Sequence, residues 1–505
     1  MSAPQSVRTS TATDPAAFTS QVNALVRDGS RFAGLYGTAR RDGCELTALL
    51  ADTDRFTVLR TLVTPDAHGE LHFPSLTPHV LAAFWYERAA HDLSGVVADG
   101  HPRLDPLLVL IDGEYGRPHP GRAHSSTSVS LRTPPGPVDV HGRGMFTIPL
   151  GPVRSGVFES VEFLIETPGE DIPHLNIRPH YKHRGVAKRF EGRSIDDGVL
   201  IAERVEGIAS VAHALAYSHA VEAMSGAVVP PKARLLRVVY AELERMANHL
   251  DVAMRLAEAA GLAVATSRFA WHKESVMRLV SELCGNRFGR SAVVPGGVAG
   301  MPSLDLAAAA RALRAIHERV RRDAALAMKT PSFLDRLRGT GILPHDRAAE
   351  WASLGPVGRA SRLEDDCRWR RPTDAYAELP LATAPPILDA GDVQARMLVR
   401  WREIDQSAVL VLAALQRLDR EPDDSMCATI DLPEGEAFGI GWSEAPQGEV
   451  LYAVTVQDSI IRRCFARSAS LHNLAAFHEV FRGDVFTDFA FIEASFGTGY
   501  AGVAM

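Results

Sequence analysis

The sequence has no close pair of cysteines. Its five cysteines, Cys44, Cys284, Cys367, Cys427 and Cys464, are spread along 505 residues, and no CxxC motif is present. A zinc or iron–sulfur site of the common local type needs cysteines a few residues apart. The sequence therefore predicts no local metal clamp, and the five thiols are interpreted as ordinary cytosolic cysteines.

The sequence also lacks an excess of positive charge and a long apolar run. It has 54 Lys and Arg against 61 Asp and Glu, a formal net charge of −7. Since phosphate binding needs a cationic surface, nucleic acid is not expected as a partner. No apolar stretch approaches the ~20 residues that span a bilayer, and the first residues have no apolar signal-peptide core. We expect a cytoplasmic chain whose membrane contact, if it has any, comes through partner subunits.

What is present indicates a large globular protein. The hydrophobic content is 46%, and the length predicts more than one domain. The first hundred residues read as a small α+β unit, with alternating strand patterns bounded by turn residues. It contains predicted helices over Ala16–Arg27 and Pro78–Leu93, and predicted strands over Arg31–Tyr36, Cys44–Ala51 and Phe56–Leu62.

A polar segment follows this unit. Residues 112–144 are rich in Pro, Gly, Ser and His and have no apolar periodicity, which is typical of a linker. We therefore predict a first domain over 1–111, a linker over 112–144 and a second domain over 145–505.

The second domain begins with strand patterns and continues with long amphipathic helices, which indicate a helical bundle. The predicted helices are Ile195–Ser225, Leu235–Ala260, Trp271–Cys284, Leu304–Met328 and Ser470–Phe481, with a strand over Val450–Gln457. The fold class expected is α+β: a small α+β domain, then a mainly helical bundle domain with a small antiparallel sheet.

Several ordered motifs resemble a known family. Glu203–Glu222 reads ERVEGIASVAHALAYSHAVE and resembles the ERxCGxCSxxHxxAxxxAVE segment of [NiFe]-hydrogenase large subunits. The GPV entry, the HRG motif, the LCGNRFGRSAVVPGGV segment and the EAPQGE motif also match; these are Gly151–Val153, His183–Gly185, Leu283–Val298 and Glu444–Glu449. In the first domain, Tyr86–Val109 resembles a motif of the complex I 30-kDa subunit. The chain is identified as a member of the group 4, formate-hydrogenlyase type large subunits and the related complex I 49-kDa subunits, fused to a 30-kDa-like domain.

The departures from the family bear on function. The four positions of the nickel-binding cysteines hold Glu206, Ala209, Gly499 and Gly502. Nickel–thiolate binding needs soft sulfur ligands, and these residues offer one hard oxygen donor at most. The resemblance therefore implies a degenerate nickel site, and we expect no metal and no cofactor bound by this chain.

The quinone partners of complex I are missing as well. By resemblance, the two histidines and the tyrosine of that site fall on Arg154, Phe158 and Gly207. Without these groups, a quinone headgroup lacks its usual hydrogen-bonding partners. Quinone binding is left open.

Three residues are candidates for a remaining function: Glu206, Arg184 and His183. The resemblance places Arg184, in the HRG motif, near an iron–sulfur cluster of a partner small subunit. Glu206 is interpreted either as a proton-carrying carboxyl or as a carboxylate paired with Arg184 or Arg204. His213 and His219 are interpreted as packing residues, and the HxxH of His180 and His183 is weak evidence for a metal.

The residues leave three functions open. The first is an oxidoreductase-complex subunit that works with an iron–sulfur small subunit and with membrane-anchor and antiporter-like subunits, peripheral on the inner face of the cell membrane. The second is a non-catalytic scaffold in such a complex. The third is a reductase of quinone or another acceptor, with a site rebuilt around Glu206 and Arg154.

Overall fold

The computed structural model describes residues 7–109, 142, 144–154, 159–379, 385–422 and 425–505. The predicted linker lies outside these residues apart from its positions 142 and 144, as does Phe158. The boundary between the two domains therefore stays a prediction.

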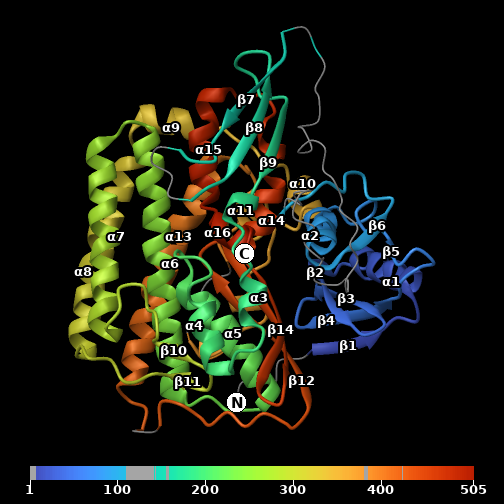
Figure 1. Cartoon of the computed structure of the whole chain (residues 1–505). Coiled ribbons are helices and arrows are strands. Elements are labelled where there is room, and N and C mark those ends of the chain that lie inside the picture. The colour runs from blue at the N-terminus through green and yellow to red at the C-terminus, as the bar shows by residue number, and fades with distance from the viewer. Residues whose placement is uncertain (1–6, 110–141, 143, 155–158, 380–384, 423–424) are drawn as a thin grey trace.

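The first region is the α+β unit that the sequence predicts (Figure 1). Its four-stranded sheet has the order β1-β4-β3-β2, antiparallel except for the β1–β4 pair. Two parallel strands, β5 and β6, form a second small sheet. The elements are β1 Val7–Thr11, α1 Pro15–Arg27, β2 Arg31–Arg40, β3 Gly43–Ala51, β4 Phe56–Val63, β5 Leu71–Pro74, α2 Phe84–Ser94 and β6 Val96–Asp99.

Four long helices form the bundle of the second region. α6, α7 and α8 confirm three predicted helices, and α13 was not predicted. α6 packs against both α7 and α13 (Figure 1). Their bounds are α6 Pro231–Ala259, α7 Ala263–Cys284, α8 Leu306–Ala327 and α13 Val393–Leu418.

Two three-stranded antiparallel sheets accompany the bundle. The first has the order β7-β8-β9 and the second the order β12-β13-β14. α5 packs directly on the second sheet, and Gly441 makes this possible because a Cβ atom there would overlap the carbonyl oxygen of Ala216. The strands are β7 Phe146–Leu150, β8 Glu162–Thr167, β9 His174–Arg178, β12 Glu436–Ala445, β13 Gly448–Gln457 and β14 Ile460–Arg467.

Two helix predictions need correction. Residues 195–225 form two helices, α4 Ile195–Ala202 and α5 Ser210–Ser225, separated by the loop 203–209. The loop is held from outside, since Glu203 accepts a hydrogen bond from the backbone N–H of Ser291 at 2.6 Å. Residues 470–481 are α-helical only within α14 Ala469–Ala475 and continue as a 3-10 helix.

The remaining elements are short. They are α3 Val186–Phe190, β10 Val293–Val294, β11 Gly297–Val298, α9 Pro331–Leu337, α10 His345–Glu350, α11 Gly355–Ala360, α12 Cys367–Arg370, α15 Phe489–Phe496 and α16 Tyr500–Val503. Among the residues that the structure describes, no helix is long and apolar enough to cross a membrane.

The two regions are joined by buried contacts. Arg31 on β2 forms ion pairs with Asp365 at 2.7 Å and with Glu449 at 2.8 Å. The rings of Tyr36 and Phe465 stack with centroids 4.6 Å apart. The junction is thus part of the packed interior.

Candidate functional site

The loop 203–209 and the C-terminal residues meet at one buried place. A Cβ atom at Gly499 or at Gly502 would overlap Oε2 of Glu206. Ala209 is also buried, and its N–H contacts the carbonyl oxygen of Glu206 at 3.4 Å. The positions that match the family's four metal ligands therefore come together, and the Glu206 carboxyl group fills the space between the two glycines.

Glu206 is held by His213 and Ser468, and among the described residues no arginine pairs with it. Its Oε1 is 3.1 Å from Nε2 of His213 and accepts a hydrogen bond from Oγ of Ser468 at 2.8 Å. His213 continues the chain through Nδ1, 2.8 Å from the hydroxyl of Tyr452. Oε2 has no hydrogen-bond partner among the described residues. The alternative in which Glu206 pairs with Arg184 or Arg204 is not what the structure has, because Arg204 pairs with Glu203 and Arg184 donates to backbone carbonyl oxygens.

These residues do not fit a nickel–thiolate centre. The site contributes no sulfur atom from any of the four matching positions, and its single carboxyl group already occupies the space between Gly499 and Gly502. A hard carboxylate oxygen beside an imidazole suits other metals better than nickel held by thiolates. What the arrangement can do is hold and exchange a proton along the carboxyl–imidazole–phenol chain.

The HRG motif fastens the C-terminal segment to the loop. The exposed Arg184 donates to the carbonyl oxygens of Arg204 at 3.3 Å, of Val205, and of Ala501 at 3.0 Å. Nδ1 of His183 lies 2.7 Å from the carbonyl oxygen of Ala504. His183 therefore positions the backbone here, and the guanidinium of Arg184 is fixed at the surface.

Arg154 does not join the Glu206 site. It forms a two-pronged ion pair with Glu493, at 2.6 and 2.9 Å, and Glu493 also accepts a hydrogen bond from Tyr500. A nearby carboxyl that sequence reasoning missed is Glu159, which accepts the N–H of Ala501 at 2.7 Å. Burial raises the pKa of Glu159, and the negative charge of Glu206 adds to the increase.

A second missed residue, Glu244, lines a cavity of about 110 Å³ beside Gly207. The cavity lies between α6, α7 and the loop, and most of its wall is apolar. Glu244 accepts the N–H groups of Val211 at 2.7 Å and Ala212 at 3.0 Å, and so caps α5. Burial raises the pKa of Glu244 to about 8 against the opposing effect of these two hydrogen bonds. Its place in the inward-facing stripe of α6 was the signal available in the sequence.

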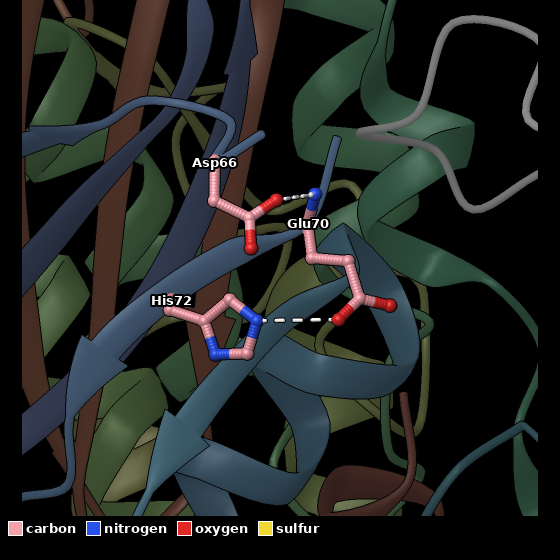
Figure 2. Close-up of side chains that lie close together, drawn as sticks. All are labelled: Asp66, Glu70 and His72. Carbon is pink, nitrogen blue, oxygen red and sulfur yellow. Dashed lines mark hydrogen bonds and ion pairs between the residues drawn. The ribbon is translucent and has the colours of Figure 1, made fainter. Parts of the chain in front are cut away.

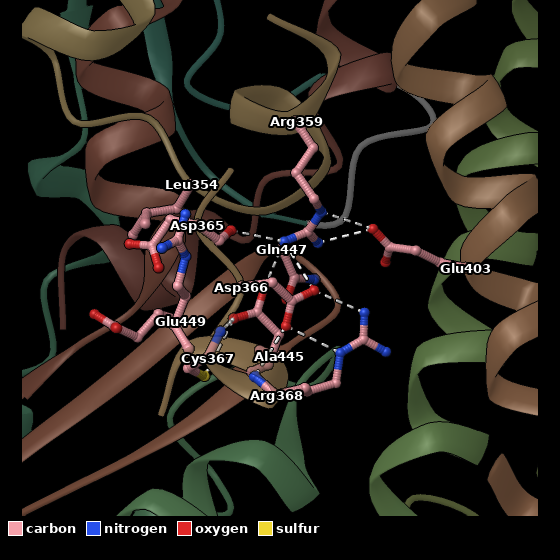
Figure 3. A network of polar contacts seen from close by, with 12 residues as sticks. Leu354, Arg359, Asp365, Asp366, Cys367, Arg368, Glu403, Ala445, Gln447 and Glu449 are labelled. Atoms are coloured by element: carbon pink, nitrogen blue, oxygen red, sulfur yellow. Dashed lines mark hydrogen bonds and ion pairs between the residues drawn. The ribbon is translucent and has the colours of Figure 1, made fainter. Parts of the chain in front are cut away.

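A buried network of ion pairs fills the interior near the domain junction (Figure 3). Arg359 contacts Glu403 at 2.8 Å, Glu444 at 3.0 Å and Asp366 at 3.2 Å, and all four side chains are buried. Arg368 extends the network to Glu242 on α6. Each carboxylate shown has a guanidinium partner, so we interpret the network as structural.

Exposed and half-buried side chains of the first domain form the one group of three metal-type ligands found among the described residues: Asp66, Glu70 and His72 (Figure 2). Asp66 accepts the N–H groups of His68 and Glu70, both at 2.8 Å, which is a turn. The turn explains the group, and we assign it no ligand. His180 and His183 of the HxxH motif are not part of such a group.

Comparisons with known proteins agree with this architecture. Residues 262–430 match the model of the respiratory-chain NADH dehydrogenase 49-kDa subunit, and residues 10–127 match that of the 30-kDa subunit. The chain is 31% identical to a carbon monoxide-induced hydrogenase of Rhodospirillum rubrum, over 61% of this chain and 84% of the relative. It is 26% identical to formate hydrogenlyase subunit 5 of Escherichia coli, over 85% of this chain and 76% of the relative.

A solved structure shows the same fold. A chain of an archaeal membrane-bound sulfane sulfur reductase superposes with a TM-score of 0.67 at 22% identity, over 73% of this chain and 100% of that one. The α+β fold with a helical bundle is thereby confirmed. The chain belongs to the family of complex I 49-kDa subunits and group 4 hydrogenase large subunits, with a 30-kDa-type domain at its N-terminal side.

Proposed function

We propose that this chain is the large-subunit-like component of a membrane-associated oxidoreductase complex, in which electrons pass through an iron–sulfur cluster held by a partner small subunit. Support comes from the relatives, which include a membrane-bound hydrogenase of Pyrococcus furiosus and a formate hydrogenlyase subunit. Membrane-anchor and antiporter-like subunits would complete the complex and hold this chain at the inner face of the cell membrane.

One observation carries the proposal that nickel has no part in this chain's function. The Glu206 carboxyl group fills the space between Gly499 and Gly502, so the segments that would present thiolates are packed against a carboxylate. To bind nickel at this place, the chain would need thiolate ligands and free space between Gly499 and Gly502.

Exposed basic side chains near the HRG motif in the sequence support the docking of the partner. Arg184, Arg189 and Arg193 are exposed, and Lys188 and Arg204 are exposed but pair with Glu191 and Glu203. A small subunit that carries a reduced, negatively charged cluster would complement this surface. Arg184 would face the cluster, because three backbone carbonyls hold its guanidinium in place.

Elemental analysis of the complex purified through this chain tests the proposal. We expect iron and sulfide from partner subunits and nickel far below one atom per chain. A group 4 hydrogenase purified in parallel is the matched control, because it should retain nickel under the same conditions. Stoichiometric nickel together with hydrogen uptake would contradict the proposal.

A scaffold role is the second candidate, and the closed packing at Glu206 favours it. His183, Arg184 and Glu159 all fasten the C-terminal segment, as expected for a site kept only for its architecture. Electron-donor assays on the purified complex separate the two: a scaffold would leave the partner cluster without turnover, whereas the electron-transfer role requires it to cycle. A site rebuilt around Glu206 and Arg154 is disfavoured, because Arg154 is paired with Glu493.

A further inference from the structure

A cleft of about 810 Å³ lies between the two regions of the chain, and Glu206 is not among the residues that line it. One wall comes from the first region, from the start of β2, the end of β3 and residues 77–82. The other wall comes from the second region, from residues between 349 and 371. Proteins commonly bind small molecules in clefts of about 300–1,000 Å³ between domains. The cleft is therefore large enough for a small organic ligand.

Two arginines of the wall have unused N–H groups. Arg31 donates through Nε to Asp365 at 2.7 Å and through Nη2 to Glu449 at 2.8 Å, and its Nη1 has no hydrogen-bond partner among the described residues. The buried Arg371 donates through Nη1 and Nη2, and its Nε has no partner in the same part of the chain. The two guanidinium groups lie close together, because both pair with Asp365 and Glu449.

A buried serine adds a third unused group to the wall. Ser353 lines the cleft with only 1% of its surface exposed, and its Oγ has no hydrogen-bond partner among the described residues. Buried polar groups without a partner are rare in folded proteins, and each one calls for a bound water, ion or ligand. The hydroxyl and the two N–H groups are all donors, so an oxygen that carries negative charge suits each of them.

Positive charge exceeds negative charge within this cluster of ion pairs. Three guanidinium groups share two carboxylates; they are those of Arg31, Arg371 and Arg467, and the carboxylates are Asp365 and Glu449. One positive charge is thus left over where the wall is largely buried. Because a buried charge is stabilised by an opposite one, this place favours an anion.

The other acidic residues of the cleft have partners of their own. The carboxylate of Asp52 accepts hydrogen bonds from the hydroxyls of Ser30 at 2.5 Å and Thr57 at 2.9 Å. The exposed Glu350 and Glu364 pair with exposed or half-buried arginines, Arg347 and Arg370. None of these three carboxylates forms an ion pair with Arg31, Arg371 or Arg467 in the part of the chain that the structure describes.

Much of the remaining wall is apolar. Val26, Phe32, Val80, Leu81 and Leu363 line the cleft, and Phe32 and Val80 are buried core residues. An apolar group placed against them is removed from water, which is favourable. The cleft therefore combines hydrogen-bond donors and positive charge with an apolar surface.

We propose that this cleft binds a small organic anion, with its carboxylate or phosphate oxygens on Arg31, Arg371 and Ser353 and its apolar part against Phe32 and Val80. Guanidinium groups recognise both kinds of oxyanion, so the chemistry assigned is the one that the two share. Since both regions contribute to the wall, the bound anion would link the first region to the second. The inference goes beyond the proposed function and does not depend on it.

Isothermal titration calorimetry of the purified full chain tests the inference with hexanoate, hexyl phosphate and the neutral hexan-1-ol. We expect at least one anion to bind with one site per chain, about tenfold or more tightly than the alcohol, because hydrogen bonds to charged groups contribute at least this factor. The anion that binds more tightly distinguishes a carboxylate ligand from a phosphate ligand. Alcohol binding as tight as that of the anions, or no saturable binding of either anion, would overturn the inference.

Two variants test the groups that hold the anion. Arg31→Lys keeps the positive charge but removes Nη1, and it should weaken binding of the preferred anion about tenfold. Ser353→Ala should weaken it about threefold, and this variant decides the matter if Arg31→Lys does not fold. The matched control is Ser218→Ala on α5, whose hydroxyl is also buried and without a partner among the described residues but lies outside the cleft; its affinity should be unchanged. Wild-type affinity in Ser353→Ala, or an equal loss in Ser218→Ala, would show that the anion binds elsewhere. Because these measurements involve neither nickel nor a partner cluster, their failure would leave the proposed function standing.

Discussion

The former metal site and the network at the domain junction are both buried and both rich in carboxyl groups, yet they are built in opposite ways. In the network, Arg359 alone contacts Glu403, Glu444 and Asp366, so negative charge is met by positive charge. At the former metal site, the side-chain partners of Glu206 in the part of the chain that the structure describes are His213 and Ser468. The arginine partners hold the pKa of Glu403 well below its usual value against its burial, whereas burial and the charge of Asp366 still raise the pKa of Glu444 to about 7.

The network should be the more fragile of the two when one charge is removed. Arg359→Met would leave three buried carboxyl groups without their shared partner, and we expect the free energy of unfolding to fall by about 3–5 kcal/mol. Chemical denaturation of the full chain measures this. The control, Arg278→Met, removes an exposed ion pair on α7 and should cost less than about 1 kcal/mol. Equal losses in the two variants would show that the network is not the stabilising element we describe.

Two glutamates of α6, Glu242 and Glu244, differ in the same way: Glu242 has arginine partners and Glu244 has none as a hydrogen-bonded neighbour among the described residues. Arg245 and Arg368 outweigh the burial of Glu242 and lower its pKa to about 2, so its contribution to stability is present above pH 4.5 and is lost as the pH falls towards 2. Burial raises the pKa of Glu244 to about 8, so its contribution is present below pH 4.5 and is lost as the pH rises through 8.

In Glu244→Gln, the free energy of unfolding should therefore no longer fall as the pH rises through 8. Between pH 5 and 9, the wild-type chain should lose roughly 2–4 kcal/mol relative to this variant. Denaturation at several pH values measures the difference. A parallel pH dependence in both proteins would mean that Glu244 ionises as an ordinary carboxyl group.

A smaller change in the free energy of unfolding is expected where Glu206 packs against the two glycines. Gly502→Ala should cost about 1–3 kcal/mol, because its Cβ would overlap Oε2 of Glu206. Adding Glu206→Ala should relieve the overlap, so the two changes should be less than additive. The control is Gly300→Ala, where nothing lies within 4 Å of the new Cβ atom. Strict additivity would indicate that Glu206 does not fill this space.

The sequence predicted the place of the site better than its contents. The resemblance matched Glu206 and Ala209 to one pair of metal-ligand positions and Gly499 and Gly502 to the other, and Glu206 lies against both glycines. Sequence reasoning missed α13, because Arg396, Arg400 and Glu403 lie on the buried face of this helix and hide its apolar period. These charges make sense only beside partners on other elements, such as His249 for Glu403.

The break between α4 and α5 was missed for a similar reason. Local residues favour a continuous helix, and the break depends on tertiary contacts: Glu203 accepts the N–H of Ser291, Arg184 donates to the loop backbone, and Glu244 caps the start of α5. Glu244 escaped attention because one acidic residue in an amphipathic helix normally lies on the solvated face.

The smallest expected effect concerns Arg184, an exposed cation on the outer face of the former metal site. Its guanidinium is held by the carbonyl oxygens of Arg204, Val205 and Ala501, so its charge keeps a constant position relative to a docked partner. A fixed positive charge stabilises the reduced, more negative form of a cluster and raises its midpoint potential. In the intact complex, Arg184→Leu should therefore lower the potential of the terminal cluster, as measured by redox titration with electron paramagnetic resonance. Arg193→Leu removes an exposed charge of the same sign outside the HRG motif and should shift the potential less. Equal shifts would mean that the cluster potential depends on the overall charge of this surface and not on the fixed position of Arg184.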